Sequence, residues 1–190
     1  MLILCALSEE QLHNKSSRAE RLIECMAHGD MAAMGELYEL LKTDVFAYAL
    51  SKAASREDAE DVMQDTFVQI WKSAAQYKPQ GKPLAWIFTI EINLIRRQFK
   101  RQEKLLSFDE AIETVANGSS FSREVIDNEF LCHLMRCLSS DEREIITLHV
   151  VSGLKHREIA QLLQKPLSTV LSKYNRGLKK LQKTVRKEEA

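Results

Sequence analysis

The sequence DAEDVMQDTFVQIW, residues 58–71, predicts an amphipathic helix with an unusual polar side. At about 100° per residue, apolar side chains such as Val62 and Phe67 fall on one broad stripe that would face a core. The opposite side carries carboxylates, yet Val68 lies in its middle and Trp71 at its edge. An apolar centre among charges is typical of a protein-binding surface. A plain amphipathic helix is an equally good interpretation, because isolated exposed apolar residues are common.

Composition indicates a soluble globular protein. The 190 residues have room for one medium domain or two small ones. Hydrophobic content of 45% with 28% charged residues argues against disorder, and no apolar run approaches the length of a membrane span. The formal net charge is zero, but from Lys165 to Lys187 basic residues occur without one acid. Such a segment can attract phosphate even on a neutral protein.

The cysteines predict a reduced, cytoplasmic protein, because Cys5, Cys25, Cys132 and Cys137 show no CxxC spacing. The start MLILCAL, residues 1–7, has no preceding basic region and is too short for a signal peptide. We interpret it as part of a loosely attached extension.

Apolar residues recur at helical spacing along almost the whole chain, which predicts an all-α protein. Asp30 should cap a helix that reaches a turn or bend near Thr43, and a second segment should run from Val45 to Ala54. A capping box at residues 55–58 opens the quoted helix, which should end near Tyr77, before two prolines and a glycine. A further helix starts near Leu84 and becomes basic at residues 96–101.

The second half of the chain has the outline of a helix-turn-helix. After a weakly periodic segment ending near residue 125, we predict a short helix at 126–138 and a capped helix from Ser139 to Ser152, stopped by Gly153. A compact helix at 156–163, a turn at 164–166 and a basic helix from Ser168 complete the pattern.

Two surfaces suit nucleic acid. On the last helix Val170, Tyr174, Leu178 and Leu181 should pack inward, while polar groups followed by cations face outward, as base edges and phosphates require. A solvated lysine-rich helix is the plainer alternative. Residues 77–104 mix aromatic and basic side chains, a combination that unstacked single strands need, although most of these aromatics could equally belong to a core.

No catalytic or cofactor arrangement stands out. Cys132, His133 and Cys137 match no common zinc spacing and favour core packing instead. His149 and His156 have no obvious catalytic partner, and a glycine-rich phosphate loop is absent from the sequence. We therefore predict a protein that is not an enzyme and needs no cofactor or metal.

The quoted helix together with YKPQGKPLAWIFTIEINLIRR, residues 77–97, resembles region 2 of bacterial sigma factors. LSSDEREIITLHVVSGLKHREIAQLLQKPLSTVLSKYNRGLKKL, residues 138–181, resembles their region 4. This order, with a short linker, resembles the extracytoplasmic-function (ECF) group of the sigma-70 family. The resemblance implies an all-α fold of two small helical domains joined by a flexible linker. The expected divisions are an extension at 1–17, region 2 at 18–104, a linker at 105–125 and region 4 at 126–187.

The resemblance also implies an alternative sigma factor that lends promoter specificity to core RNA polymerase. The coiled coil of the largest polymerase subunit would be bound by Asp61, Gln64, Asp65, Val68 and Trp71. The melted minus-10 element would be held by Tyr77, Lys78, Lys82, Asn93, Arg96, Arg97, Lys100 and Arg101. The duplex minus-35 element would be read by Lys155, Ser168, Thr169, Ser172, Lys173, Asn175, Arg176, Lys179 and Lys180. Further expected partners are the polymerase flap and an anti-sigma factor, without membrane insertion.

Several residues depart from the family pattern. Lys155 stands where Ser or Thr usually caps a helix. Gln164 stands where glycine is common, so we expect Gln164 to be held at a positive φ. Leu171 and Ile92 each replace a frequent basic residue, and Gly177 should weaken its helix. Two alternatives therefore stay open. One is a helix-turn-helix regulator that binds a palindrome as a dimer, and the other is an interaction protein that has lost promoter recognition.

Overall fold

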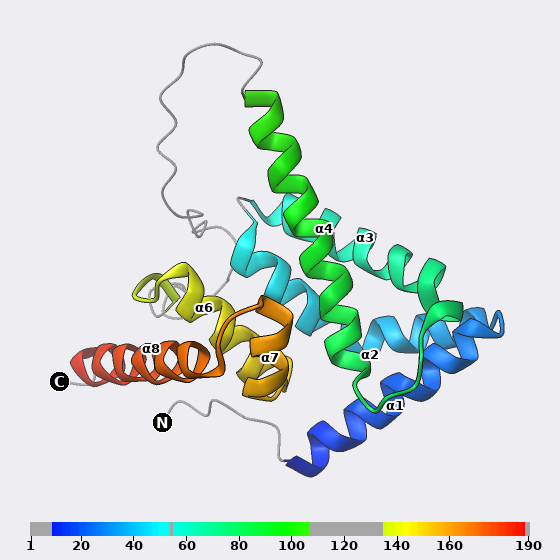
Figure 1. The fold of residues 1–190 in the computed structure, drawn as a ribbon, viewed down its shortest axis with the longest axis horizontal. Helices are drawn as coiled ribbons and strands as arrows, with labels where there is room; N and C mark the ends of the chain where they lie inside the picture. The colour runs from blue at the N-terminus through cyan, green and yellow to red at the C-terminus, as the bar shows by residue number, and fades with distance from the viewer. Residues whose placement is uncertain (1–8, 54, 107–134, 189–190) are drawn as a thin grey trace.

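The computed structural model describes residues 9–53, 55–106 and 135–188. This part of the chain is helical and contains no strand, as predicted (Figure 1). Its elements are α1 (Glu9–Ala27), α2 (Met31–Lys52), α3 (Arg56–Ser73), the 3-10 turn η1 (Ala74–Gln76), α4 (Pro83–Leu106), α6 (Ser140–Ile146), the π-helical η3 (Thr147–Val151), α7 (His156–Leu163) and α8 (Leu167–Glu188). The predicted linker at 105–125 and the predicted helix at 126–138 lie almost wholly outside the described residues.

The predicted helix starts are confirmed by their caps. The Asp30 carboxylate accepts hydrogen bonds from the backbone N–H groups of Ala32 and Ala33, and Ser55 accepts one from Asp58. Ser139 and Glu142 form a reciprocal capping box. Side chains next to each start thus satisfy backbone donors that the first helical turn leaves without partners.

Helix α2 runs without a break from Met31 to Lys52, so the predicted bend near Thr43 is wrong. The sequence contains no proline in this span, and the buried stripe continues straight past Thr43 through Leu41, Val45 and Tyr48. Helices α1, α3, α4 and α6 all pack on α2. Because α2 is covered on several sides, further apolar residues lie outside this stripe, and the pattern looks interrupted in the sequence.

Helix α1 starts inside the segment predicted as an extension. Lys15 pairs with the buried carboxylate of Asp44, and Arg18 pairs with Glu36 at 3.1 Å. The second half of α1 inserts Ile23 and Met26 into the core. Residues 1–8 lie outside the described residues.

Helices α7 and α8 form the predicted helix-turn-helix. Gln164 takes the left-handed conformation expected of it, with φ of 55°, and the N–H of Lys165 donates to the carbonyl of Ala160 at 3.0 Å. Gly153, before α7, has φ of 71° as predicted for a helix stop. These positive φ values turn the chain sharply enough to pack short helices against each other.

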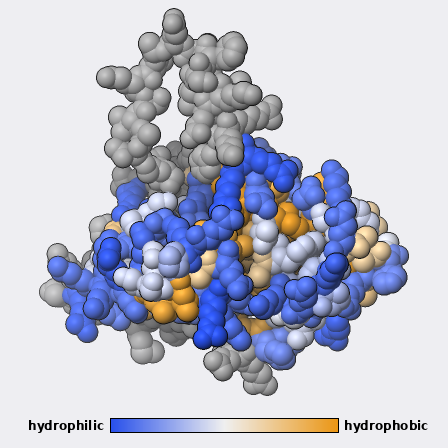
Figure 2. Space-filling model, viewed as in Figure 1, coloured by the Kyte–Doolittle hydropathy of each residue, from blue (hydrophilic) through white to orange (hydrophobic). Residues whose placement is uncertain are grey.

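The two halves of the chain share one hydrophobic core. Ile145 and Ile159 of the second half belong to the same buried cluster as Leu37 and Ile87 of the first. In Figure 1, α6 and α7 lie against α2 and α4, and residue contacts link these pairs. Polar residues cover most of the face seen in Figure 2, with apolar residues between them.

Gly177 is explained by a close approach of α8 to α6. A Cβ atom built at Gly177 would lie 2.6 Å from Cδ1 of Ile146 and 3.4 Å from Cδ2 of Leu138. Glycine therefore lowers the helix propensity of α8 but permits this contact.

We predict that Gly177→Ala lowers the free energy of unfolding by about 1–3 kcal/mol, because the added methyl overpacks the contact with Ile146. Gly35→Ala is the matched control. Gly35 lies in α2 with no atom within 4 Å of a built Cβ, so alanine there should add up to about 1 kcal/mol. Urea unfolding followed by circular dichroism measures both. Equal stabilisation by the two substitutions would contradict the proposed crowding.

Glu91 is a fully buried carboxyl group on α4. Burial, and to a smaller degree the charge of Asp44, raise the pKa of Glu91 well above its ordinary value of 4.5. The folded protein therefore holds Glu91 protonated at pH values where the unfolded chain has lost this proton. Stability from this group is complete below pH 4.5 and declines as the pH rises toward the folded pKa.

We predict that Glu91→Gln, an uncharged isostere, stabilises the protein at neutral pH. Its advantage over the wild type should be small at pH 4 and grow with pH by up to about 1.4 kcal/mol per unit, until the folded pKa is reached. Urea unfolding at pH 4, 6 and 8 measures this. A difference that stays constant across these values would contradict a buried neutral carboxyl.

Candidate functional site

The first surface lies on α3. Asp61, Gln64, Asp65 and Val68 are all exposed along one side of this helix, and 47% of Val68 is accessible. Trp71, at the end of the row, is half-buried and packs on the core. The helix thus places one large apolar side chain among acids and an amide. This arrangement suits binding to a partner protein through an apolar contact that charged groups surround.

The second surface is the loop between η1 and α4, which α1 holds in place. The hydroxyl of Tyr77 donates to Glu20 Oε1 at 2.8 Å, and the N–H of Gly81 donates to the same oxygen at 2.9 Å. The Tyr77 ring lies 4.9 Å from the ring of Trp86. Burial and the nearby Glu20 raise the pKa of Tyr77, so its hydroxyl keeps the proton it donates. Sequence analysis missed Glu20, which is remote in sequence and has no distinctive motif.

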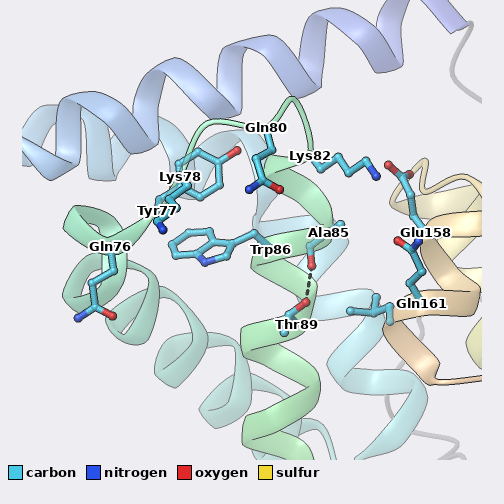
Figure 3. Close-up of a pocket in the computed structure, with 11 residues that line it drawn as sticks. Gln76, Tyr77, Lys78, Gln80, Lys82, Ala85, Trp86, Thr89, Glu158 and Gln161 are labelled. Carbon is cyan, nitrogen blue, oxygen red and sulfur yellow. Dashed lines mark hydrogen bonds between the residues drawn. The ribbon is translucent and has the colours of Figure 1, made fainter.

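A cavity of about 440 Å³ opens beside this loop. Figure 3 shows Lys78, Lys82 and Trp86 on the loop and α4, with Glu158 and Gln161 of α7 across from them. The Lys82 ammonium and the Glu158 carboxylate point toward each other. Three predicted minus-10 residues, Tyr77, Lys78 and Lys82, therefore line this cavity together with residues of the helix-turn-helix half.

The remaining predicted residues on α4 divide into two groups. Asn93, Arg96 and Arg97 are exposed. Ile92 is buried in the core. It therefore cannot contact DNA in place of the basic residue that is frequent in the family at this position. The side chains of the predicted residues Lys100 and Arg101 lie outside the described structure.

The third surface is the outer face of α8 with the start of α7. Of the residues predicted here, Thr169 is half-buried, and Lys173 and Lys180 pair with α6. The others are exposed: Lys155, Ser168, Ser172, Asn175, Arg176 and Lys179. Leu171, which was noted as unusual, is also exposed among them. The N–H of Lys155 donates to Glu158 at 2.9 Å, which partly replaces the missing side-chain cap. The first turns of α8 therefore present short polar groups and one apolar group.

Acidic residues of α6 hold two of the predicted DNA-binding lysines. Lys173 pairs with Asp141 at 2.6 Å, and Lys180 pairs with the buried Glu142 at 2.6 Å. Lys165 also pairs with Asp141, at 2.7 Å. The two lysines lower the pKa of Asp141 to about 2, so it stays ionised at any physiological pH. These cations are partly neutralised before any nucleic acid arrives.

We predict that Asp141→Asn increases binding to mixed-sequence duplex DNA, because it releases Lys165 and Lys173 for phosphate contacts. The affinity should rise several-fold, and the plot of log K against log salt should steepen by up to about 2. Fluorescence anisotropy at several salt concentrations measures both. The control is Asp61→Asn, with the same charge change on α3. An identical gain in the control would show a general charge effect rather than release of these lysines.

The described residues hold no group of three or more His, Cys, Asp or Glu side chains placed to bind a metal ion. Cys132 and His133 lie outside this part of the chain. Within the same residues, no helix has the length and apolar content that crossing a membrane requires.

Comparison with known proteins identifies two family regions. Residues 37–105 match the model of Sigma-70 region 2, and residues 132–181 match that of Sigma-70 region 4. The chain is 27% identical over 156 residues to the ECF RNA polymerase sigma factor BldN of Streptomyces coelicolor, covering 79% of this chain and 59% of BldN. It is 25% identical over 173 residues to the ECF sigma factor SigK of Mycobacterium sp. (strain KMS), covering 84% and 86%.

Solved structures show the same fold. CnrH in complex with the cytosolic domain of CnrY aligns with a TM-score of 0.62 and 24% identity, over 89% of this chain and 97% of CnrH. The sigma factor RpoE of Bartonella quintana, in complex with the anti-sigma factor NepR, gives a TM-score of 0.62 and 24% identity over 80% and 96%.

Region 2 precedes region 4 along the chain. Exposed surfaces lie on α3 and α4 in the first region and on α8 in the second. The chain belongs to the sigma-70 family of RNA polymerase sigma factors, within its ECF group. It directs transcription initiation as a non-enzymatic subunit, which confirms the function predicted from the sequence. The individual contact residues remain predictions.

Proposed function

We propose that this ECF sigma factor binds core RNA polymerase through α3, holds the melted minus-10 element on α4 and its preceding loop, and reads the minus-35 duplex with α8. The observation that carries the proposal is the row of exposed residues on α3, where Val68 stands among Asp61, Gln64 and Asp65 while the opposite side of the helix is buried.

On α3, Val68 would fill an apolar site on the coiled coil of the largest polymerase subunit. Asp61 and Asp65 would then pair with basic groups around that site. Burial of Val68 supplies affinity, whereas the acids set orientation and association rate. The half-buried Trp71 would extend the apolar contact at the end of the row.

The minus-10 surface combines an aromatic pair with cations. Tyr77 and Trp86 lie against each other, while Lys78 and Lys82 are exposed on the loop. Bases that leave the duplex stack on aromatic rings, and cations hold the phosphates between them. Asn93, Arg96 and Arg97 continue this surface along α4 and would follow the non-template strand.

The minus-35 surface would enter the major groove with the first turns of α8. Ser168, Ser172 and Asn175 can hydrogen-bond to base edges, and Arg176 can bind either guanine or phosphate. Lys179 lies one turn further along and would contact the backbone. The flap of the polymerase would hold this half of the sigma factor at the required distance.

We further propose regulation by an anti-sigma factor, and a cytoplasmic location beside the chromosome and the polymerase. RpoE of Bartonella quintana, which has the same fold, was solved with the anti-sigma factor NepR. An occupant of the α3 row would compete directly with polymerase.

We predict that the double substitution Asp61→Lys with Gln64→Ala raises the Kd for core polymerase by about tenfold or more, because it reverses a rim charge and shortens its neighbour. Biolayer interferometry measures the Kd, and circular dichroism checks the fold. Glu24→Lys, with the same charge reversal on the exposed side of α1, should leave the Kd unchanged. Unchanged affinity in the double variant would refute the assignment of this row.

The proposed function is tested by adding purified protein to core polymerase that lacks its own sigma subunit and mapping transcripts started on genomic DNA. Discrete new start sites that share two upstream elements would support the proposal. Absence of new starts from a folded protein that binds polymerase would overturn the proposed promoter surfaces.

A further inference from the structure

Glu20 on α1 binds both ends of the loop that joins η1 to α4, residues 77–82. Its Oε1 accepts hydrogen bonds from the Tyr77 hydroxyl at 2.8 Å and from the N–H of Gly81 at 2.9 Å. Tyr77 is the first residue of this loop, and Gly81 lies two residues before the start of α4 at Pro83. One carboxylate oxygen therefore bridges the loop from its beginning to its left-handed turn, where Gly81 has φ of 67°.

The packing of α1 fixes the position of this carboxylate. Ala19 and Ile23, on either side of Glu20 along the helix, are fully buried. Helix α1 packs on α2, and it also packs on η1 and α4, the two elements that flank the loop. Lys15 of α1 pairs with the buried Asp44 of α2. Glu20 therefore has a defined place relative to the loop, rather than belonging to a loosely attached extension.

The loop has little packing of its own. Residues 78–82 are all exposed, so their side chains bury little apolar surface. Segments of this kind open easily unless hydrogen bonds hold them. Hydrogen bonds to a charged acceptor are stronger than those between neutral groups. We therefore expect the two bonds to Glu20 to set the shape of the loop.

The groups that Glu20 holds belong to the proposed minus-10 surface. The ring of Tyr77 lies 4.9 Å from that of Trp86. Lys78 directly follows Tyr77, and Lys82 directly follows Gly81, so the direction of each lysine depends on a backbone that Glu20 fixes. A site that has its final shape before the ligand arrives avoids the cost of ordering on binding. It also discriminates better, because a wrong ligand cannot reshape it.

We propose that Glu20 is a positioning residue for promoter recognition: it holds the loop of Tyr77 and Gly81 in the shape that receives an unpaired base of the minus-10 element, and so sets how strictly this base is selected. Glu20 acts through the loop and needs no contact with DNA. This role rests on the proposed function for the identity of the ligand. Residues 37–105 match region 2, so promoter selectivity would depend on a residue that precedes the matched segment.

Hydrogen exchange of the Gly81 amide, followed by NMR on the full chain, tests the two bonds without any partner. Glu20→Ala removes the acceptor, and exchange at Gly81 should become about tenfold faster. Glu20→Gln keeps an oxygen that can accept both bonds and should stay within about threefold of the wild type. Glu24→Ala is the control. Glu24 is exposed one turn further along α1 and its charge also reaches Tyr77, so a pure charge effect would appear there too.

The effect on selectivity is measured with core polymerase and the full chain on a promoter library with randomised minus-10 and minus-35 bases. Sequencing of the transcripts gives the ratio of preferred to disfavoured bases at each position. We expect Glu20→Ala to lower this ratio by about threefold or more within the minus-10 element only. Ratios in the minus-35 element should stay unchanged, whereas a general loss of stability would lower all transcripts and keep every ratio. Glu20→Gln and Glu24→Ala should resemble the wild type.

A double-mutant cycle tests whether Glu20 acts through Tyr77. Tyr77→Phe removes one donor and keeps the ring beside Trp86. Combined with Glu20→Ala, it should lower selectivity no further than Glu20→Ala alone, because both changes break the same bond. Losses that multiply would show independent roles and overturn the proposal. If circular dichroism shows that Glu20→Ala loses helix content, Glu20→Met takes its place, since it keeps a long side chain without the acceptor.

The outcomes separate this role from the proposed function. If Gly81 exchanges as fast in the wild type as in Glu20→Ala, the loop is not held by Glu20 and the proposal fails. Faster exchange in Glu20→Ala with unchanged minus-10 ratios would also overturn it, while promoter recognition by the loop and α4 would stand. A wild-type holoenzyme without any minus-10 preference would instead refute the proposed minus-10 surface, and the role of Glu20 with it.

Discussion

Tyr48 of α2 lies where the two halves of this structure meet. Its ring packs edge-on against Phe88 of α4, with centroids 5.8 Å apart, while its hydroxyl bonds to Glu144 of α6. One side chain of α2 therefore belongs both to the core of the first half and to its contact with the second half. Burial raises the pKa of Tyr48 well above its ordinary value, so the hydroxyl remains a donor to the carboxylate. Helix α2 serves as the central support of the molecule, since α1, α3, α4 and α6 all rest on it.

Features that depend on neighbours in sequence were predictable. The caps at Asp30, Ser55 and Ser139 follow from a polar side chain two or three residues before a backbone donor. The turn at Gln164 follows from the short spacing between α7 and α8. Features that depend on distant residues were not predictable. The straight course of α2, the contact of Glu20 with Tyr77 and the close approach at Gly177 each arise from a partner tens of residues away or on another helix.

The same distinction explains which parts of the site could be found from sequence. The outward rows on α3 and α8 follow from helical periodicity, and the structure places them on the surface. Periodicity could not reveal that Lys173 and Lys180 lie against acids of α6. Counting lysines along α8 therefore overstates the positive charge available to phosphate. Pairing with these acids also holds the two lysines in fixed positions and weakens indiscriminate attraction to DNA.

The close packing at Gly177 has a consequence for how promoter preference can evolve. The helix that carries Ser172 and Asn175 is positioned by contacts at Gly177 with Leu138 and Ile146, which lie on the buried side of α8. Enlarging or shrinking these side chains would tilt α8 as a whole rather than move a single side chain. If α8 reads promoter DNA as proposed, a lineage could change its set of promoters through the core of this domain while every exposed residue of α8 stays the same.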